Sequence, residues 1–157
     1  MLQTYIPDCV FVDIFSGSGG IGIEALSRGA RKAYFIENAP KALACIEDNL
    51  AFTKMKDRAI VLKQDACAGL TGIYEKHVDV IFMDPPREGS TPQFIESVAR
   101  MAPKRVVYVS CNPETLARDL ALLTKKGYRV ESSTPVDMFP HSEHIETVCA
   151  LSRRHKA

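Results

Sequence analysis

A glycine-rich turn near the amino terminus has a residue pattern well suited to binding a nucleoside. Gly17, Gly19 and Gly22 have the GxGxxG spacing, which permits a tight turn and a close approach of the backbone to a ligand. Glu37 ends the next apolar run, about 20 residues beyond Gly17, where a carboxylate can bind ribose hydroxyl groups. This pattern predicts a nucleoside cofactor at the first turn of the chain.

Acidic residues around this turn narrow the choice of cofactor. Asp13 precedes the first glycine by four positions, and a carboxylate there would repel the pyrophosphate of a dinucleotide. It suits the cationic amino acid end of S-adenosylmethionine, so the sequence favours this methyl donor. Asp65, after the third apolar run, can accept the adenine amino group, although Asp13, Glu37 and Asp65 have the alternative role of caps or turn residues. The predicted cofactor-binding residues are Asp13, Ser16, Gly17, Ser18, Gly19, Glu37, Asn38, Asp65, Ala66 and Asp84.

The segment Asp84-Pro85-Pro86-Arg87 follows the fourth apolar run and is the second candidate functional segment. Its two prolines restrict the backbone, so the Asp84 carboxylate is held rigidly. As an isolated tetrapeptide, this sequence is typical of an ordinary turn. Its position after an apolar strand, at the edge where ligands bind in sheets of this kind, favours a binding loop instead.

Cys111 is the candidate nucleophile. It follows the fifth apolar run and precedes a helical segment, so its thiol lies near the positive end of a helix dipole, which favours the thiolate. The other cysteines lack such a setting and are interpreted as reduced structural residues. They are Cys9, Cys45, Cys67 and Cys149. Because the cysteines are odd in number and form no CxxC pair, we expect neither a disulfide framework nor a metal site.

The segments between these candidate residues alternate between predicted strands and predicted helices. Short apolar runs predict strands at 9–15, 33–36, 59–62, 78–83 and 105–109. Helical spacing predicts helices at 21–27, 40–50, 91–101 and 113–124, and two last strands, 128–133 and 145–151, are expected to pair antiparallel. The expected fold is α/β, with a Rossmann-like, doubly wound and mostly parallel sheet of seven strands.

Composition indicates one soluble domain that spans residues 1–157. With 46% hydrophobic residues, the chain is long enough to enclose one core but short for two. No apolar run reaches the length of a membrane span, and no leader pattern is seen, so we expect a cytoplasmic protein. The net charge of +1 lacks the basic excess of a dedicated nucleic acid binder. His141 and His144 lack a third ligand and are interpreted as loop histidines, so no metal is expected.

Three segments of the second half together resemble the RNA uracil-C5 methyltransferase family. They are Asp84-Pro-Pro-Arg87, Ser110-Cys-Asn-Pro-Glu-Thr-Leu-Ala-Arg-Asp119 and the stretch from Pro135 to Val148. The resemblance covers residues 79–151. It implies an S-adenosyl-L-methionine-dependent enzyme with the Rossmann-like class I methyltransferase fold and with ribosomal or transfer RNA as its substrate.

The same resemblance implies a role for each matched residue. Cys111 matches the nucleophile that adds to carbon 6 of uracil and thereby activates carbon 5 toward the methyl group. Glu146 matches the base that removes the hydrogen from carbon 5. Asp84 would hydrogen-bond the uracil edge, and Arg118 would help to hold the motif loop. The implied catalytic residues are Cys111, Glu146 and Asp84, and the implied substrate-binding residues are Pro85, Pro86, Arg87 and Arg118.

The first half resembles a different family, the bacterial 16S ribosomal RNA guanine-N2 methyltransferases. This resemblance rests on residues 1–7, 19–30 and 35–38 and on Asp84-Pro-Pro86. Arg87 departs from that family, in which an aromatic residue at this position stacks on the target base. Guanine-N2 methylation is therefore the alternative activity. A third possibility is a cofactor-binding module without catalysis, because the chain begins almost at its first strand, without the upstream segment that helps to seat the base.

Overall fold

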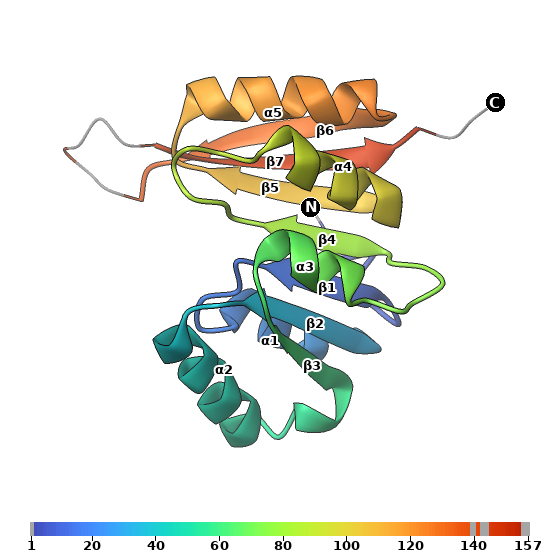
Figure 1. Ribbon diagram of the computed structural model, residues 1–157, viewed down its shortest axis with the longest axis vertical. Helices are drawn as coiled ribbons and strands as arrows, with labels where there is room; N and C mark the ends of the chain where they lie inside the picture. The colour runs from blue at the N-terminus through green and yellow to red at the C-terminus, as the bar shows by residue number, and fades with distance from the viewer. Residues whose placement is uncertain (1, 139–140, 142–144, 155–157) are drawn as a thin grey trace.

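The computed structural model describes residues 2–138, 141 and 145–154, which form a seven-stranded sheet covered by helices (Figure 1). The strand order is β3-β2-β1-β4-β5-β7-β6, with β1 to β5 parallel and β7 antiparallel to both β5 and β6. The strands are β1 Val10–Ile14, β2 Lys32–Glu37, β3 Ala59–Lys63, β4 Val80–Met83, β5 Arg105–Ser110, β6 Tyr128–Val136 and β7 Glu146–Arg153. The helices are α1 Gly20–Ser27, α2 Pro40–Phe52, α3 Ala66–Thr71, α4 Pro92–Met101 and α5 Pro113–Lys125, with a short 3-10 turn, η1, at Lys56–Arg58. The predicted Rossmann-like α/β fold is confirmed, including its C-terminal antiparallel pair.

Two hydrophobic cores lie on opposite faces of the sheet. Because successive side chains of a strand point to opposite faces, β1 contributes Val10, Val12 and Ile14 to one core and Phe11 to the other. Helices α3, α4 and α5 cover the first core, and α1 and α2 cover the second. In Figure 1, α3 and α4 lie in front of the sheet and α1 lies behind it. Strand β1, buried on both faces, is therefore a rigid base for the loop that follows it.

Helix α3 is not predicted by the sequence pattern. Asp65 begins α3, and its Oδ1 accepts hydrogen bonds from the N–H groups of Cys67 at 3.0 Å and Ala68 at 3.1 Å. A helix of six residues is too short to display a helical period, so only the preceding strand was recognised. Strand β6 also runs past its predicted end, because it pairs with β7 as far as Val136. Pro135 is tolerated there since β6 is an edge strand.

The candidate residues converge because parallel strands end together at one edge of the sheet. Ile14 of β1 pairs with Met83 of β4, and Met83 pairs with Tyr108 of β5. The loops after β1, β4 and β5 therefore leave the sheet side by side. Strand β7 runs the other way and begins at this same edge, where Thr147 pairs with Ser110. The edge faces left in Figure 1.

Replacing Gly22 with alanine is expected to destabilise the fold, because α1 packs closely against β2 at this glycine. A methyl group at Gly22 would lie 2.3 Å from Cε1 of the buried Phe35. Overpacking of this kind lowers the free energy of unfolding by roughly 1–3 kcal/mol. Gly20→Ala, in the same helix, is the matched control, since its methyl group would meet only Ser18 Oγ at 3.8 Å. Denaturant unfolding compares the two variants, and equal stabilities would contradict the packing argument.

Candidate active site

The turn after β1 is shaped by left-handed glycines and anchored by Glu37. The φ angles of Gly17 and Gly19 are 56° and 79°. The Glu37 Oε2 accepts a hydrogen bond from the Gly17 N–H at 2.9 Å, and Oε1 accepts from the N–H groups of Asn38 and Ala39 at 2.8 and 2.9 Å. A carboxylate offers about four acceptor positions, so Glu37 can accept a further hydrogen bond from a ligand hydroxyl group.

Asp13 lies beneath this turn and is 1% exposed. Its Oδ2 accepts a hydrogen bond from the Gly22 N–H at 2.9 Å, within the first turn of α1. Burial raises the pKa of the Asp13 carboxyl to about 7, and repulsion from Asp84 and Glu37 adds to this shift. The three carboxylates make this part of the protein attractive to a cation.

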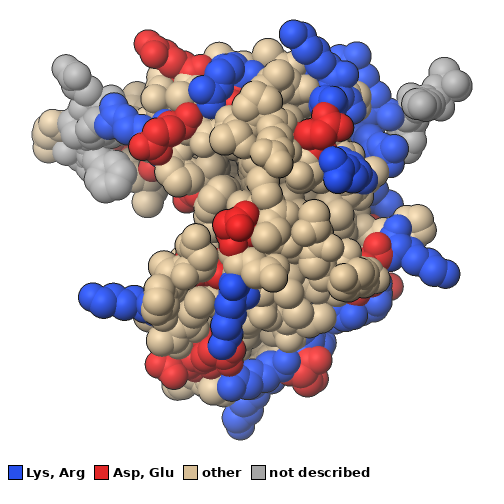
Figure 2. Space-filling view, in the orientation of Figure 1, with Lys and Arg blue, Asp and Glu red and all other residues tan. Residues whose placement is uncertain are grey.

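A pocket of about 620 Å³ opens beside the turn, a volume within the usual range for small-molecule sites. Its lining residues are Asp13, Phe15, Ser16, Gly17, Ser18, Gly20, Ile21, Phe82, Asp84, Val109, Val136, Met138, Glu146 and Val148. Figure 2 shows the surface hollowed on the left, at the edge where the parallel strands end. The densest group of Lys and Arg side chains on the viewed face lies on the other side, near the carboxyl terminus.

The predicted cofactor residues divide between this pocket and a smaller neighbour. Ser16, Gly17 and Ser18 line the larger pocket, whereas Gly19 lines neither. The smaller pocket has a volume of about 100 Å³ and is lined by Ile36, Glu37, Asn38, Gln64, Asp65 and Ala66 together with Phe15. Phe15 lines both pockets, so the two pockets are neighbours.

Asp84 and Glu146 line the larger pocket from the loop after β4 and from the start of β7. Partial loss of hydration raises the pKa of Asp84, and the charge of Glu146 adds to the effect. The Glu146 Oε2 is buried and has no hydrogen-bond partner among the described residues. Buried polar atoms without a partner are rare in folded proteins, so this oxygen is available to a ligand.

Cys111 is partly buried and lies between β5 and α5. It is not among the lining residues of the 620 Å³ pocket. Ser110, which precedes Cys111, pairs with Thr147, which follows Glu146. Because β5 and β7 are antiparallel, Cys111 and Glu146 lie one position beyond this pair, on the same side of it. Asn112, which follows Cys111, caps α5 with its side chain. The structure thus brings a thiol at a helix start and a half-buried carboxylate to the same edge of the sheet.

The Asp84-Pro-Pro-Arg87 loop rests against α5. Pro85 is buried, whereas Pro86 and Arg87 are exposed. The Arg87 carbonyl accepts hydrogen bonds from two side chains in the first turn of α5. Arg118 donates to two carbonyl groups further along the same loop. Arg118 therefore contacts the backbone of the loop.

A buried polar cluster behind this loop escaped the sequence analysis. Ser90, Tyr108 and Asp119 are all buried, and they hydrogen-bond one another. One signal for Asp119 was present in the sequence. It is spaced three residues from Leu116 and four from Leu123, both buried, so it lies on the stripe of α5 that faces the sheet.

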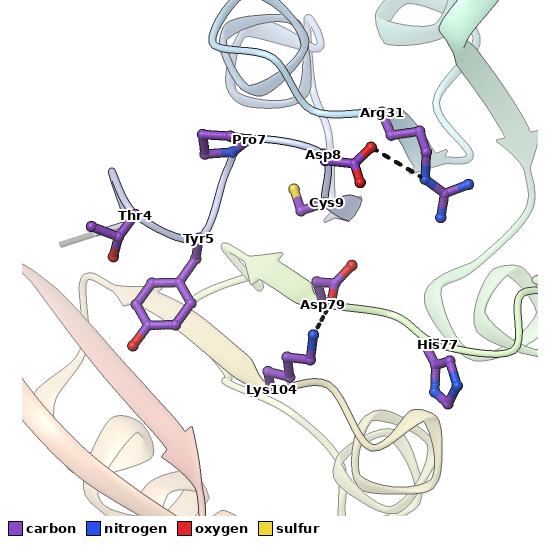
Figure 3. Close-up of a pocket in the computed structure, with 9 residues that line it drawn as sticks. All are labelled: Thr4, Tyr5, Pro7, Asp8, Cys9, Arg31, His77, Asp79 and Lys104. Carbon is purple, nitrogen blue, oxygen red and sulfur yellow. Dashed lines mark ion pairs between the residues drawn. The ribbon is translucent and has the colours of Figure 1, made fainter.

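A second pocket, of about 610 Å³, lies at the opposite edge of the sheet (Figure 3). Its charged side chains are paired: Arg31 Nε lies 3.8 Å from Asp8 Oδ1, and Lys104 Nζ lies 2.7 Å from Asp79 Oδ1. Asp79 also accepts a hydrogen bond from the Val10 N–H at 2.9 Å. These groups satisfy one another, whereas one oxygen of Glu146 has no hydrogen-bond partner within residues 2–138, 141 and 145–154. The pocket at the carboxyl ends of the strands is therefore the candidate site.

Within residues 2–138, 141 and 145–154, no group of three or more His, Cys, Asp or Glu side chains is arranged to hold a metal ion. In the same part of the chain, no helix has the length and apolar character needed to cross a membrane. His141 is exposed, and His144 lies outside the described residues.

Known proteins are similar to this chain in sequence and in fold. A family model described as "Conserved hypothetical protein 95" matches residues 1–136. The chain is 38% identical over 141 residues to an uncharacterized RNA methyltransferase of Caldanaerobacter subterraneus subsp. tengcongensis, and 39% identical over 147 residues to one of Bacillus cereus. These alignments include 90% and 92% of this chain but only 31% and 32% of the relatives, so the chain spans about a third of their length.

The solved structure of Pyrococcus abyssi tRNA (uracil-54, C5)-methyltransferase in complex with S-adenosyl-L-homocysteine is also similar. The TM-score is 0.80 and the sequence identity is 30%. The superposition covers 96% of this chain and 36% of the archaeal protein. The likeness therefore extends over nearly all of the present chain.

Proposed function

Because this chain belongs to the family described as Conserved hypothetical protein 95, we propose that it is the catalytic domain of an S-adenosylmethionine-dependent methyltransferase that modifies a base in RNA. The RNA substrate is supported by relatives that are named RNA methyltransferases. The methyl donor is supported by the archaeal relative, which holds S-adenosyl-L-homocysteine, the product left when this donor loses its methyl group.

The residues of the two neighbouring pockets fit this donor. The buried Asp13 carboxylate would attract its ammonium group, and Glu37 retains acceptor capacity for ribose hydroxyl groups. The smaller pocket, with Asn38 and Asp65, would take the adenine. When bound, the donor supplies an electrophilic methyl group on a positively charged sulfur. The carboxylates of Asp13, Asp84 and Glu146 favour that positive charge.

The comparisons and the site favour different target atoms. The family match over residues 1–136 spans the half of the chain that resembles guanine-N2 methyltransferases, so it supports that alternative better than uracil C5. One observation on the site favours uracil C5: Cys111 follows Ser110, Glu146 precedes Thr147, and Ser110 pairs with Thr147, so a thiol and a carboxylate lie at the same edge of the sheet. Methylation of carbon 5 requires a nucleophile and a base, whereas a guanine amino group can attack a methyl group directly. Uracil C5 is therefore the proposed target, and guanine N2 is the second candidate.

In the proposed reaction, the Cys111 thiolate forms a bond to carbon 6 of uracil, and carbon 5 of the resulting enolate takes the methyl group, releasing S-adenosylhomocysteine. The Glu146 carboxylate then accepts the proton from carbon 5. The bond between Cys111 and carbon 6 breaks, which restores the thiolate and the double bond of the pyrimidine. Asp84, which lines the same pocket, would hydrogen-bond the edge of the base, and its carboxylate can accept from the N–H at position 3 of uracil.

Nucleoside mass spectrometry tests the proposed function. The protein is incubated with unmodified ribosomal and transfer RNA and a methyl donor labelled in its methyl group. Labelled 5-methyluridine is the expected product. N2-methylguanosine without 5-methyluridine would overturn the proposed target in favour of the second candidate. Calorimetric binding of S-adenosylmethionine without methylation of any RNA would indicate a cofactor-binding module that does not catalyse the reaction.

Glu146→Gln is expected to leave a covalent protein–RNA complex on ordinary uridine-containing RNA, because the proton at carbon 5 is no longer removed. Multiple turnover should fall by at least about 100-fold, while one methyl group per protein is still transferred. Denaturing gels and intact mass measure the complex. Glu47→Gln, an ion-paired residue on α2, is the matched control and should turn over normally. Unchanged turnover by Glu146→Gln would contradict its role as the base.

A further inference from the structure

Asp119 of α5 is a completely buried carboxylate that the proposed reaction does not use. Its Oδ2 accepts hydrogen bonds from the Ser90 N–H and the Tyr108 hydroxyl, both at 2.6 Å. Its Oδ1 accepts from Arg118 Nε at 2.9 Å. These four residues, Ser90, Tyr108, Arg118 and Asp119, are called the Asp119 cluster below. Removing a carboxylate from water costs several kcal/mol, so an apolar side chain at this core position would be more favourable for stability.

The Asp119 cluster is bonded to the backbone of the loop that follows Asp84-Pro-Pro-Arg87. Arg118 Nη2 donates to the carbonyls of Glu88 at 3.1 Å and Ser90 at 3.0 Å. Gly89 lies so close that a methyl group there would be 2.7 Å from Asp119 Oδ2. Its φ of 76° is also one that a side chain disfavours. The loop is thus pressed onto α5, with little freedom to shift.

The same helix holds the other end of this loop and carries Cys111 immediately before its start. Asn112 Nδ2 and Thr115 Oγ1 lie 3.4 and 3.3 Å from the Arg87 carbonyl oxygen, which accepts from both. Strand β5, which leads into Cys111, also supplies Tyr108 to the Asp119 cluster. Asp119 is therefore bonded both to the loop after β4 and to the strand that ends at the thiol.

We infer that Asp119 is a positioning residue, which acts with Arg118 to fix the Asp84-Pro-Pro-Arg87 loop relative to the Cys111 thiol. This inference rests on the proposed function, in which the loop holds the base that Cys111 attacks. Misplacement of reacting groups by about 1 Å can reduce a rate by about 100-fold. The methyl donor would bind at the ends of β1 and β2, and no residue of the Asp119 cluster lines either of those pockets. Donor affinity should therefore not depend on Asp119.

Asp119→Asn tests this inference, because the amide keeps the shape but has one acceptor oxygen for three donors. We expect kcat for RNA methylation to fall by roughly 10- to 100-fold, with donor affinity within about twofold of the wild type. Asp79→Asn is the matched control. Asp79 also accepts from a backbone N–H and a cation, Val10 at 2.9 Å and Lys104 at 2.7 Å, but at the opposite edge of the sheet. It should lose stability and keep its kcat.

Arg118→Ala supplies a second test that leaves every buried side chain in place, because the Arg118 side chain itself is 52% exposed. Arg118→Ala should lower kcat by a similar factor. The variant that combines Arg118→Ala with Asp119→Asn should have a kcat only slightly below that of either single variant, since the two residues act as one unit. Unchanged kcat in both single variants, or an equal loss in Asp79→Asn, would overturn the inference. A wild-type protein that methylates no RNA would instead overturn the proposed function.

Discussion

Cys111→Ala is expected to lower methyl transfer to RNA by roughly 1,000-fold or more and to abolish any covalent adduct with the RNA. Without addition of a thiolate to carbon 6, carbon 5 of uracil is too weak a nucleophile to take the methyl group. RNA that contains 5-fluorouridine makes the step visible, because a base cannot remove fluorine from carbon 5 as it removes a proton. The wild-type protein and methyl donor should therefore form an adduct that survives a denaturing gel.

Cys45→Ala is the matched control for this experiment, because Cys45 is an exposed thiol on α2. It should form the adduct and methylate RNA like the wild type. An adduct that persists in Cys111→Ala would show that another group is the nucleophile. Full methyl transfer by Cys111→Ala, with N2-methylguanosine as the product, would favour the second candidate function.

Asp13→Asn is expected to weaken S-adenosylmethionine binding by roughly 10- to 100-fold, because the pocket loses the charge that would attract the donor's ammonium group. The amide oxygen can still accept from the Gly22 N–H, so the glycine turn should keep its shape. Titration calorimetry measures the loss. Asp8→Asn, a carboxylate whose side chain is 89% exposed at the opposite edge, is the control and should bind normally. Equal affinities of Asp13→Asn and the wild type would contradict the assigned role.

The same variant is expected to be more stable than the wild type at alkaline pH. Folding raises the pKa of Asp13 from 3.8 to about 7, so its ionisation opposes folding. This unfavourable contribution is absent below about pH 4, grows as the pH rises, and is complete above about pH 7, where it reaches roughly 4 kcal/mol. Denaturant unfolding between pH 4 and 8 should show a widening gap between Asp13→Asn and the wild type. A gap independent of pH would mean that Asp13 does not titrate in this range.

The sheet and most of its helices were predictable because their signals are local. A buried parallel strand is a short apolar run, and a helix of ten or more residues shows its period. The six-residue α3 carries no such period, and its start is set by the Asp65 cap. The length of β6 depends on its partner β7, which lies nearby in space but not in the local sequence pattern. Local patterns therefore predict that an element exists better than where it ends.

The residues proposed to face the donor could also be identified from the sequence, since the glycine spacing and the acids at strand ends are local features. The hydrogen bonds that these acids accept within the protein could not be predicted from the sequence. In the fold, Asp13, Glu37 and Asp65 each accept hydrogen bonds from backbone N–H groups. All three residues therefore have the turn or cap role that the sequence offered as the alternative to cofactor binding. For Glu37 it is compatible with ligand binding, because a carboxylate has capacity to spare.

Local sequence patterns are enough to predict the alternation of strands and helices, the glycine turn and the cysteine before a helix, because each depends on residues close together in the chain. Which of these groups meet depends on the packing of the folded chain. Strand β7 inserts between β5 and β6, which brings Glu146 to the edge beside Cys111, where one of its carboxylate oxygens has no partner in the part of the chain that the structure describes. The packing of α5 likewise buries Asp119 behind the Asp84 loop. Such contacts depend on strand pairing and burial between distant segments, and no local pattern encodes them.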